Sequence, residues 1–193
     1  MSDSTTIASP TLLRLDNISK HFPGTIALDG IDFDLNAGEV HILFGENGAG
    51  KSTLIQTIAG VFKQTSGEMF LNGRRIDFQS VQHARSAGVS AVFQEFSLIP
   101  QLSVEENLFL GDEPSTAGFL NKTESKQRAK EMLDRLGFPL HPNDPVMYLS
   151  RAEQQMVEIA KAFRKQPSIM ILDEPTSSLT EKETDRLFEL IAE

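Results

Sequence analysis

Eight residues, Gly45 to Ser52, read Gly-Glu-Asn-Gly-Ala-Gly-Lys-Ser and match the phosphate-binding pattern G-x-x-x-x-G-K-[ST]. Glycines let the backbone curl around a phosphate without Cβ clashes, and the amides at a helix N-terminus attract anions. Lys51 would reach the β- and γ-phosphates of a nucleoside triphosphate, and the Ser52 hydroxyl would bind Mg²⁺. The residues predicted to hold the nucleotide are Gly45, Glu46, Asn47, Gly48, Ala49, Gly50, Lys51, Ser52 and Thr53.

The flanks of this loop fit the context that the pattern requires. Glu39 to Phe44 is a β-branched and aromatic run that predicts a buried parallel strand, and Thr53 to Ala59 has apolar residues at helical spacing. An ordinary glycine-rich turn before a helix is the alternative. The order of strand, loop and helix, together with the Lys-Ser ending, favours the phosphate site.

A second apolar run, Ser168 to Leu172, ends in two adjacent carboxylates, Asp173 and Glu174. Strand alternation sends the two side chains in different directions, so Asp173 could hold Mg²⁺ while Glu174 addresses a water beyond the γ-phosphate. Glu174 is therefore the candidate general base for hydrolysis. A strand that simply ends in a polar turn is the alternative, and the upstream phosphate loop favours the catalytic interpretation.

The apolar patterns predict an α/β fold in which several parts surround the phosphate loop. Alternation near Leu13 and between Ile31 and Leu35, with an Asn-Gly turn in residues 67–73, predicts an antiparallel β subdomain. Unalternated runs at 88–93 and 168–172 predict central strands of a mostly parallel sheet beside the Val40–Phe44 strand. An all-helical insertion, about 95–165, is expected from helical patterns at 103–110, 123–136 and 151–164.

Composition limits the class of protein. The chain has 193 residues, no cysteine and a formal net charge of −9, which excludes disulfides and argues against nucleic acid as a partner. No apolar stretch is long enough to span a bilayer. Residues 1–11 are predicted to be a flexible tail, and residues 12–193 one domain.

The motifs occur in a recognisable order. Leu149 to Gln155 lies between Gln94 and the Asp173-Glu174 pair, with Ser150 and Glu153 placed for a capping box, and capping alone could explain those two residues. The whole order resembles that of the ATP-binding cassette (ABC) transporter ATPases, with a P-loop NTPase core. Three phrases resemble the N-terminal cassette of bacterial sugar importers of the ribose, galactose and xylose type: Lys20–Gly30, Gln94–Gly111 and Gln154–Ala162.

This resemblance implies roles for residues whose types alone do not reveal them. Phe22 resembles the aromatic residue that stacks on adenine, although a lone Phe is otherwise more often in a core. Gln94 resembles the residue that touches Mg²⁺ and the attacking water, and otherwise would be a polar strand-end residue. Ser177 to Thr180 resembles the loop that crosses the interface between two cassettes. The signature loop, which closes on ATP held by the opposite cassette, corresponds to Ser150, Arg151, Ala152 and Glu153.

The resemblance also implies partners and a location. A second cassette, transmembrane permease subunits and, indirectly, a periplasmic sugar-binding protein are expected, at the cytoplasmic face of the bacterial inner membrane. Phe96, Leu98, Ile99 and Leu102 would dock the permease, and burial in the helical insertion is the alternative. ATP and Mg²⁺ are the implied cofactors, with Ser52, Gln94 and Asp173 at the metal.

Two features depart from the family pattern. Arg151, Ala152 and Glu153 replace the usual Gly, Gly and Gln, and the added carboxylate predicts a weaker site for the ATP of the opposite cassette. The family's switch histidine follows a later strand, whereas all four histidines, the last being His141, lie upstream of Asp173. We therefore expect a cassette incomplete at its C-terminus, from a fragment or a short gene product.

Two other functions remain open. A soluble cassette used in translation or DNA maintenance would need basic grooves or long coiled-coil insertions, and the acidic sequence contains neither. A nucleotide-binding module without turnover of its own is suggested by the altered signature loop and the absent histidine.

Overall fold

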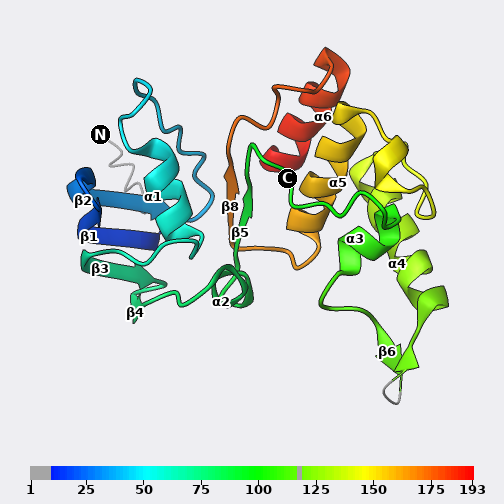
Figure 1. Ribbon diagram of the computed structural model, residues 1–193, viewed down its shortest axis with the longest axis horizontal. Coiled ribbons are helices and arrows are strands. Elements are labelled where there is room, and N and C mark those ends of the chain that lie inside the picture. The colour runs from blue at the N-terminus through cyan, green and yellow to red at the C-terminus, as the bar shows by residue number, and fades with distance from the viewer. Residues whose placement is uncertain (1–9, 117–118) are drawn as a thin grey trace, which may run out of the picture. The chain divides into compact units, whose positions relative to one another are not determined.

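The computed structural model describes residues 10–116 and 119–193. The described residues up to Ala87 form one compact unit, and those from Gly88 onward form a second (Figure 1). Residues 1–9 of the predicted tail lie outside the described part, and the first strand begins at Thr11. No helix among the described residues is long and apolar enough to cross a membrane.

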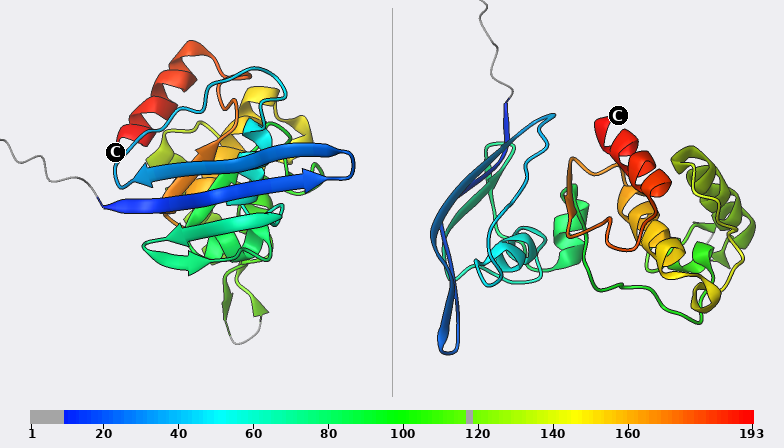
Figure 2. Two further views of the ribbon diagram at one scale, coloured as in Figure 1. Left: turned by 90° about the vertical axis from the view of Figure 1, so that its left-hand side faces the viewer. Right: turned by 90° about the horizontal axis from the view of Figure 1, so that it is seen from above.

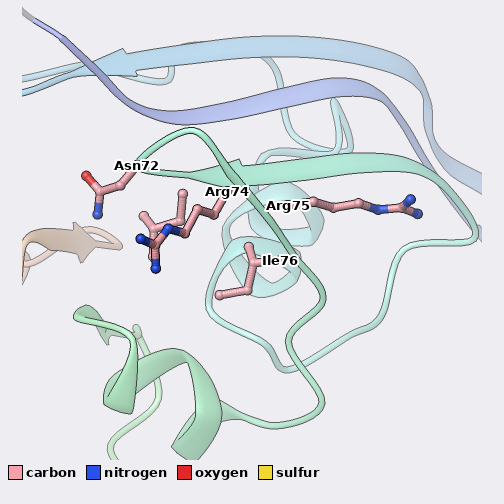
Figure 3. Close-up of a pocket in the computed structure, with 5 residues that line it drawn as sticks. Asn72, Arg74, Arg75 and Ile76 are labelled. Atoms are coloured by element: carbon pink, nitrogen blue, oxygen red, sulfur yellow. The ribbon is translucent and has the colours of Figure 1, made fainter.

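The first unit contains an antiparallel sheet in the order β2-β1-β3-β4 (Figure 2, left). Its strands are β1 (Thr11–Phe22), β2 (Thr25–Asn36), β3 (Ser66–Leu71) and β4 (Arg74–Ile76). In β1 the alternating Leu13 and Leu15 are buried at 1% exposure, because every second side chain points to the same face. Asn72 and Gly73 both have positive φ, 52° and 72°, as a tight hairpin turn requires. The predicted antiparallel subdomain and its Asn-Gly turn are confirmed. Asn72 of that turn also lines a pocket, together with Leu71, Arg74, Arg75 and Ile76 (Figure 3).

Two helices complete the first unit. Helix α1 (Lys51–Ile58) follows the phosphate loop as predicted, and its Leu54, Ile55 and Ile58 are buried. Helix α2 (Val81–Ser86) is capped by Ser80, whose hydroxyl accepts a hydrogen bond from His83 N–H at 3.1 Å.

The strand predicted for Glu39–Phe44 is wrong. Residues 39–44 have no strand assignment, and Val40, Ile42 and Phe44 are 69%, 81% and 98% exposed. Local contacts explain part of this, since the Glu39 carboxylate accepts the Asn36 N–H at 2.9 Å and pairs with His41 Nδ1 at 2.9 Å. That hydrogen bond from Asn36 holds the pKa of Glu39 below its usual range. An apolar run forms a strand only when a neighbouring strand pairs with it, and the described structure shows no such pairing.

The second unit joins a parallel strand pair to a helical layer. β5 (Val89–Val92) and β8 (Ile169–Leu172) pair in parallel, as predicted, from Val89 opposite Ile169 to Val92 opposite Leu172. All helices expected in this part are present, with a further one at the end. The helices are α3 (Val104–Phe109), α4 (Lys122–Leu136), the 3-10 turn Val146–Tyr148, α5 (Arg151–Phe163) and α6 (Glu181–Ala192). Two short strands, β6 (Ser115–Thr116) and β7 (Phe119–Leu120), pair as an antiparallel hairpin.

The core of this unit joins all four helices to the sheet. Leu108 of α3, Leu133 of α4, Ile159 of α5 and Leu187 of α6 are each at most 1% exposed and belong to one apolar cluster with Val92 of β5. The α/β class is therefore confirmed, with parallel pairing among the described residues confined to β5 and β8. The carboxyl ends of these two strands carry the predicted catalytic residues.

Candidate nucleotide-binding site

The glycine loop adopts the backbone that phosphate binding needs. Gly48 and Gly50 have φ of 87° and 84°, and Ala49 N–H donates to Glu46 O at 3.2 Å. Helix α1 starts at Lys51 with no side chain capping its first turn, so its amides are available to an anion. Gly50 is also required sterically, because a Cβ there would lie 2.5 Å from the Ala27 carbonyl oxygen.

The Lys51 side chain lies against the start of the glycine loop. Its Nζ donates to the carbonyl oxygens of Gly45 at 2.7 Å and Glu46 at 2.8 Å. The ammonium is thus held at the loop by neutral acceptors. Phosphate oxygens are stronger acceptors because they carry charge, so a triphosphate can displace these carbonyls.

Phe22 lies in the same unit, at the end of β1, and is half-buried. Its ring packs edge-on against Phe62, with centroids 5.2 Å apart and planes at 79°. Lys20 Nζ lies 5.0 Å from the Phe22 centroid and 5.5 Å from that of Phe62, and it donates to Lys63 O at 2.7 Å. Phe62 lies 40 positions after Phe22, and no spacing rule links the two, so the sequence alone does not predict this pair.

The carboxyl ends of β5 and β8 bring the other predicted residues together. Asp173 N–H donates to Val92 O at 3.0 Å, and Gln94 follows Val92 by two residues. Asp173 is partly buried, whereas Gln94 and Glu174 are exposed. Glu174 has φ of 48°, a left-handed conformation that non-glycine residues rarely adopt. Such strain is concentrated at functional sites.

The predicted signature loop forms the start of α5. Ser150 is the N-cap, with Glu153 N–H donating to Ser150 Oγ at 3.3 Å and Ser150 N–H donating to Glu153 Oε2 at 2.7 Å. The predicted capping box is therefore present. Arg151 lies with its guanidinium 3.6 Å from the ring centroid of Phe96, and Ala152 is half-buried.

The site residues fall into two groups. Phe22 and Gly45 to Thr53 lie in the first unit, and Gln94, Ser150 to Glu153 and Asp173-Glu174 lie in the second. Each group includes side-chain oxygens of the kind that Mg²⁺ binds, in Ser52 of the first group and in Gln94 and Asp173 of the second. No cluster of three or more His, Cys, Asp or Glu in the described ranges could hold a metal by itself.

An α/β domain with a glycine loop opening onto a helix, and an Asp-Glu pair ending a parallel strand, defines a P-loop nucleotide-binding domain. The chain belongs to the ABC transporter family, whose model matches residues 28–177.

Two curated relatives show the level of similarity. The chain is 50% identical over 180 residues to ribose import ATP-binding protein RbsA 3 of Rubrobacter xylanophilus, covering 93% of this chain and 36% of that protein. It is 46% identical over 179 residues to arabinose import ATP-binding protein AraG of Paraburkholderia xenovorans, covering 93% and 35%. The chain thus spans about a third of the length of these relatives.

Solved structures agree on the fold. A bacterial ABC transporter cassette, described as dimeric, matches with a TM-score of 0.80 at 27% identity, covering 93% of this chain and 81% of that chain. A dimeric ATP-binding cassette in a post-hydrolysis state, bound to ADP and Pi, matches with a TM-score of 0.77 at 28% identity, covering the same shares.

Proposed function

We propose that this chain is the ATP-binding and ATP-hydrolysing part of an ABC importer for a carbohydrate. The observation that carries the proposal is the glycine loop, in which Gly48 and Gly50 have left-handed backbones and Lys51 Nζ lies at the loop carbonyls. Relatives named as ribose and arabinose import proteins support the carbohydrate. The dimeric cassette structures support a second cassette as the partner.

In this proposal the residues divide the work. Loop amides and Lys51 bind the phosphates, and Phe22 supports the adenine. Ser52, Asp173 and Gln94 would hold Mg²⁺, which when bound neutralises charge on the phosphates. Glu174, exposed beside the partly buried Asp173, takes the proton from the attacking water.

The same proposal gives the chain a docking surface for permease subunits at the cytoplasmic face of the bacterial inner membrane. Ile99 is 37% exposed, whereas Leu98 packs against the apolar core and is less suited to docking. Met147 and Tyr148, 52% and 78% exposed, extend the surface, because Met147 N–H donates to Pro100 O at 2.9 Å. Crosslinking of Ile99 or Tyr148 to a permease would test this part, and a crosslink only at Phe119, which is 80% exposed on β7, would contradict it.

Two variants test the nucleotide chemistry. Lys51→Ala should weaken binding of fluorescent ATP by at least about tenfold, since it removes a charge-assisted contact to phosphate. Glu174→Gln should retain binding and lose phosphate release by about a hundredfold or more, the size expected of a general base. Lys126→Ala on the exposed face of α4 is the control. Unchanged binding by Lys51→Ala would overturn the proposal.

Binding without phosphate release by the native protein, even when paired with a second cassette, would instead support a nucleotide-binding module without turnover. The signature loop motivates this second candidate, because Arg151 adds a side chain where the family usually has glycine and Glu153 adds a negative charge where it usually has glutamine.

A further inference from the structure

Helix α5 holds the segment that follows Gln94 with three side chains. At its start, the Arg151 guanidinium lies 3.6 Å from the Phe96 ring centroid. About two turns further on, Glu158 accepts hydrogen bonds from Ser97 N–H and, at 2.8 Å, from Ser97 Oγ. Lys161 Nζ donates to the same Ser97 Oγ at 3.0 Å. The Ser97 hydroxyl therefore donates to the Glu158 carboxylate and accepts from the Lys161 ammonium, so both of these hydrogen bonds are made with α5.

The Glu158 contact fixes Ser97 because the carboxylate is buried. Glu158 is 6% exposed, and a buried carboxylate is costly unless hydrogen-bonded. Ser97 provides two of the hydrogen bonds that satisfy it. If Ser97 moved away from α5, the carboxylate would lose both, so Ser97 should move with the helix.

Other contacts leave Gln94 little freedom. Val92, at 0% exposure, is fixed in β5, and only residues 93–95 separate it from Phe96. Beyond Ser97, the fully buried Asn107 accepts from Ile99 N–H at 2.7 Å and donates to Ile99 O at 3.0 Å. Gln94 thus lies on a short span between β5 and a segment held by α3 and α5.

We propose that α5 positions Gln94, with Glu158 as the positioning residue and the Arg151–Phe96 stack as a second point of attachment. Residues Ser150 to Glu153 form the start of α5, so a displacement of that loop moves the helix. The contacts of the helix with Phe96 and Ser97 then transmit the movement to Gln94. This inference rests on the proposed function only for its catalytic consequence. The positional part follows from the contacts alone.

The positional part can be measured directly, because the chain contains no cysteine. A spin label on Gln94→Cys should show restricted motion with native Glu158 and at least about twofold faster motion with Glu158→Ala, which removes the acceptor. Glu158→Gln should restore most of the restriction, because its amide oxygen still accepts from Ser97 N–H. Ser97→Ala should give an intermediate result.

Glu105→Ala is the matched control for this measurement. Glu105 is a carboxylate of similar exposure, 7% against 6%, on α3 rather than α5. Loss of a buried carboxylate there can lower stability but should leave the label at position 94 unchanged. A label equally mobile with native Glu158 and Glu158→Ala, or shifted equally by Glu105→Ala, would overturn the proposal.

Turnover measurements test the catalytic consequence. In the ATP-hydrolysing protein, Glu158→Ala should lower kcat by about tenfold, the effect of losing one charge-assisted hydrogen bond, with KM for ATP unchanged. In a Gln94→Ala background it should cause no further loss, because the residue acts through Gln94. An equal loss in both backgrounds would show a merely structural role. If the native protein gave no turnover, the proposed function would fail and the spin label alone would decide this inference.

Discussion

Glu174 has an exposed carboxylate and a left-handed backbone conformation that non-glycine residues rarely adopt. Its φ is 48°, and it directly follows Asp173, whose N–H donates to Val92 O just after β8 ends at Leu172. A left-handed conformation costs a non-glycine residue about 1–2 kcal/mol. The chain accepts this cost in a turn that presents a carboxylate to solvent, which fits a residue retained for chemistry rather than for stability.

The strain at Glu174 predicts that glycine is more stable than alanine at this position, the reverse of the order on an exposed helix face. Glu174→Gly should be more stable than Glu174→Ala by about 1 kcal/mol, because glycine accepts positive φ without strain. At Lys130, on the exposed face of α4, the order should be reversed by a similar amount, about 1 kcal/mol in favour of alanine. Urea unfolding of the four variants measures both differences. If alanine were the more stable at position 174 as well, Glu174 would not be strained.

The glycine loop offers a second comparison between residues of nearly equal φ. Gly50→Ala should destabilise the fold more than Gly48→Ala, because a Cβ at Gly50 meets the Ala27 carbonyl at 2.5 Å, whereas nothing lies within 4 Å of one at Gly48. Both variants share the strain of a left-handed alanine, about 1–2 kcal/mol. The additional clash should at least double that loss for Gly50→Ala. Denaturant unfolding without nucleotide measures the difference, and equal losses would exclude the close approach of Gly50 to β2.

At the level of elements, the sequence predicted what depends on near neighbours. The helices α3, α4 and α5, the capping box of Ser150 and the Asn72-Gly73 turn follow from periodicity or from contacts within a few residues. The same holds for the glycine loop. Pairings between distant residues gave no such signal. The contacts of Phe62 with Phe22 and of Glu158 with Ser97 join distant residues that no local pattern links. Residues 39–44 are exposed, and whether a strand pairs with such a run does not follow from the run itself.

A link between the end of α5 and the loop after α3 predicts a pH-dependent stability. Asp112 Oδ2 lies 2.8 Å from Lys165 Nζ and 3.0 Å from Arg164 Nη2. The hydrogen bond from Lys165, together with the charge of Arg164, holds the pKa of Asp112 below its usual range. Because the folded pKa lies below the unfolded one, ionised Asp112 stabilises the fold above the unfolded pKa. This contribution is lost as pH falls through the folded pKa.

Asp112→Asn should therefore lower Tm by about 1–3 °C at neutral pH, the size expected of a partly exposed pair, with the difference disappearing in acid. Circular dichroism melts of both proteins across this range give the measurement. Asp134→Asn is the control, since Asp134 is 68% exposed and 3.9 Å from Lys130 Nζ. A difference in Tm that persisted at the lowest pH would mean that the amide at position 112 disturbs packing rather than charge.

For the whole molecule, the start of α5 is the surface on which the proposed pairing of two cassettes depends. The Glu153 carboxylate is occupied by the Ser150 N–H at 2.7 Å, and the Arg151 guanidinium lies over Phe96. Among the described residues Arg151 forms no ion pair with Glu153, so it does not offset the carboxylate at this helix N-terminus. If the ATP of an opposite cassette approaches this end, the charge opposes the γ-phosphate, so this side should close more weakly.

Glu153→Gln separates the two effects of that charge. The amide oxygen still accepts from Ser150 N–H, so the capping box is retained, but the favourable interaction of a carboxylate with the helix dipole, about 0.3–1 kcal/mol, is lost. Tm should therefore fall slightly while the ATPase rate of paired cassettes rises severalfold, because repulsion of the incoming phosphate is removed. Glu131→Gln, on the exposed face of α4, should change neither quantity. A lower Tm without any gain in the ATPase rate would show that Glu153 serves only to cap α5.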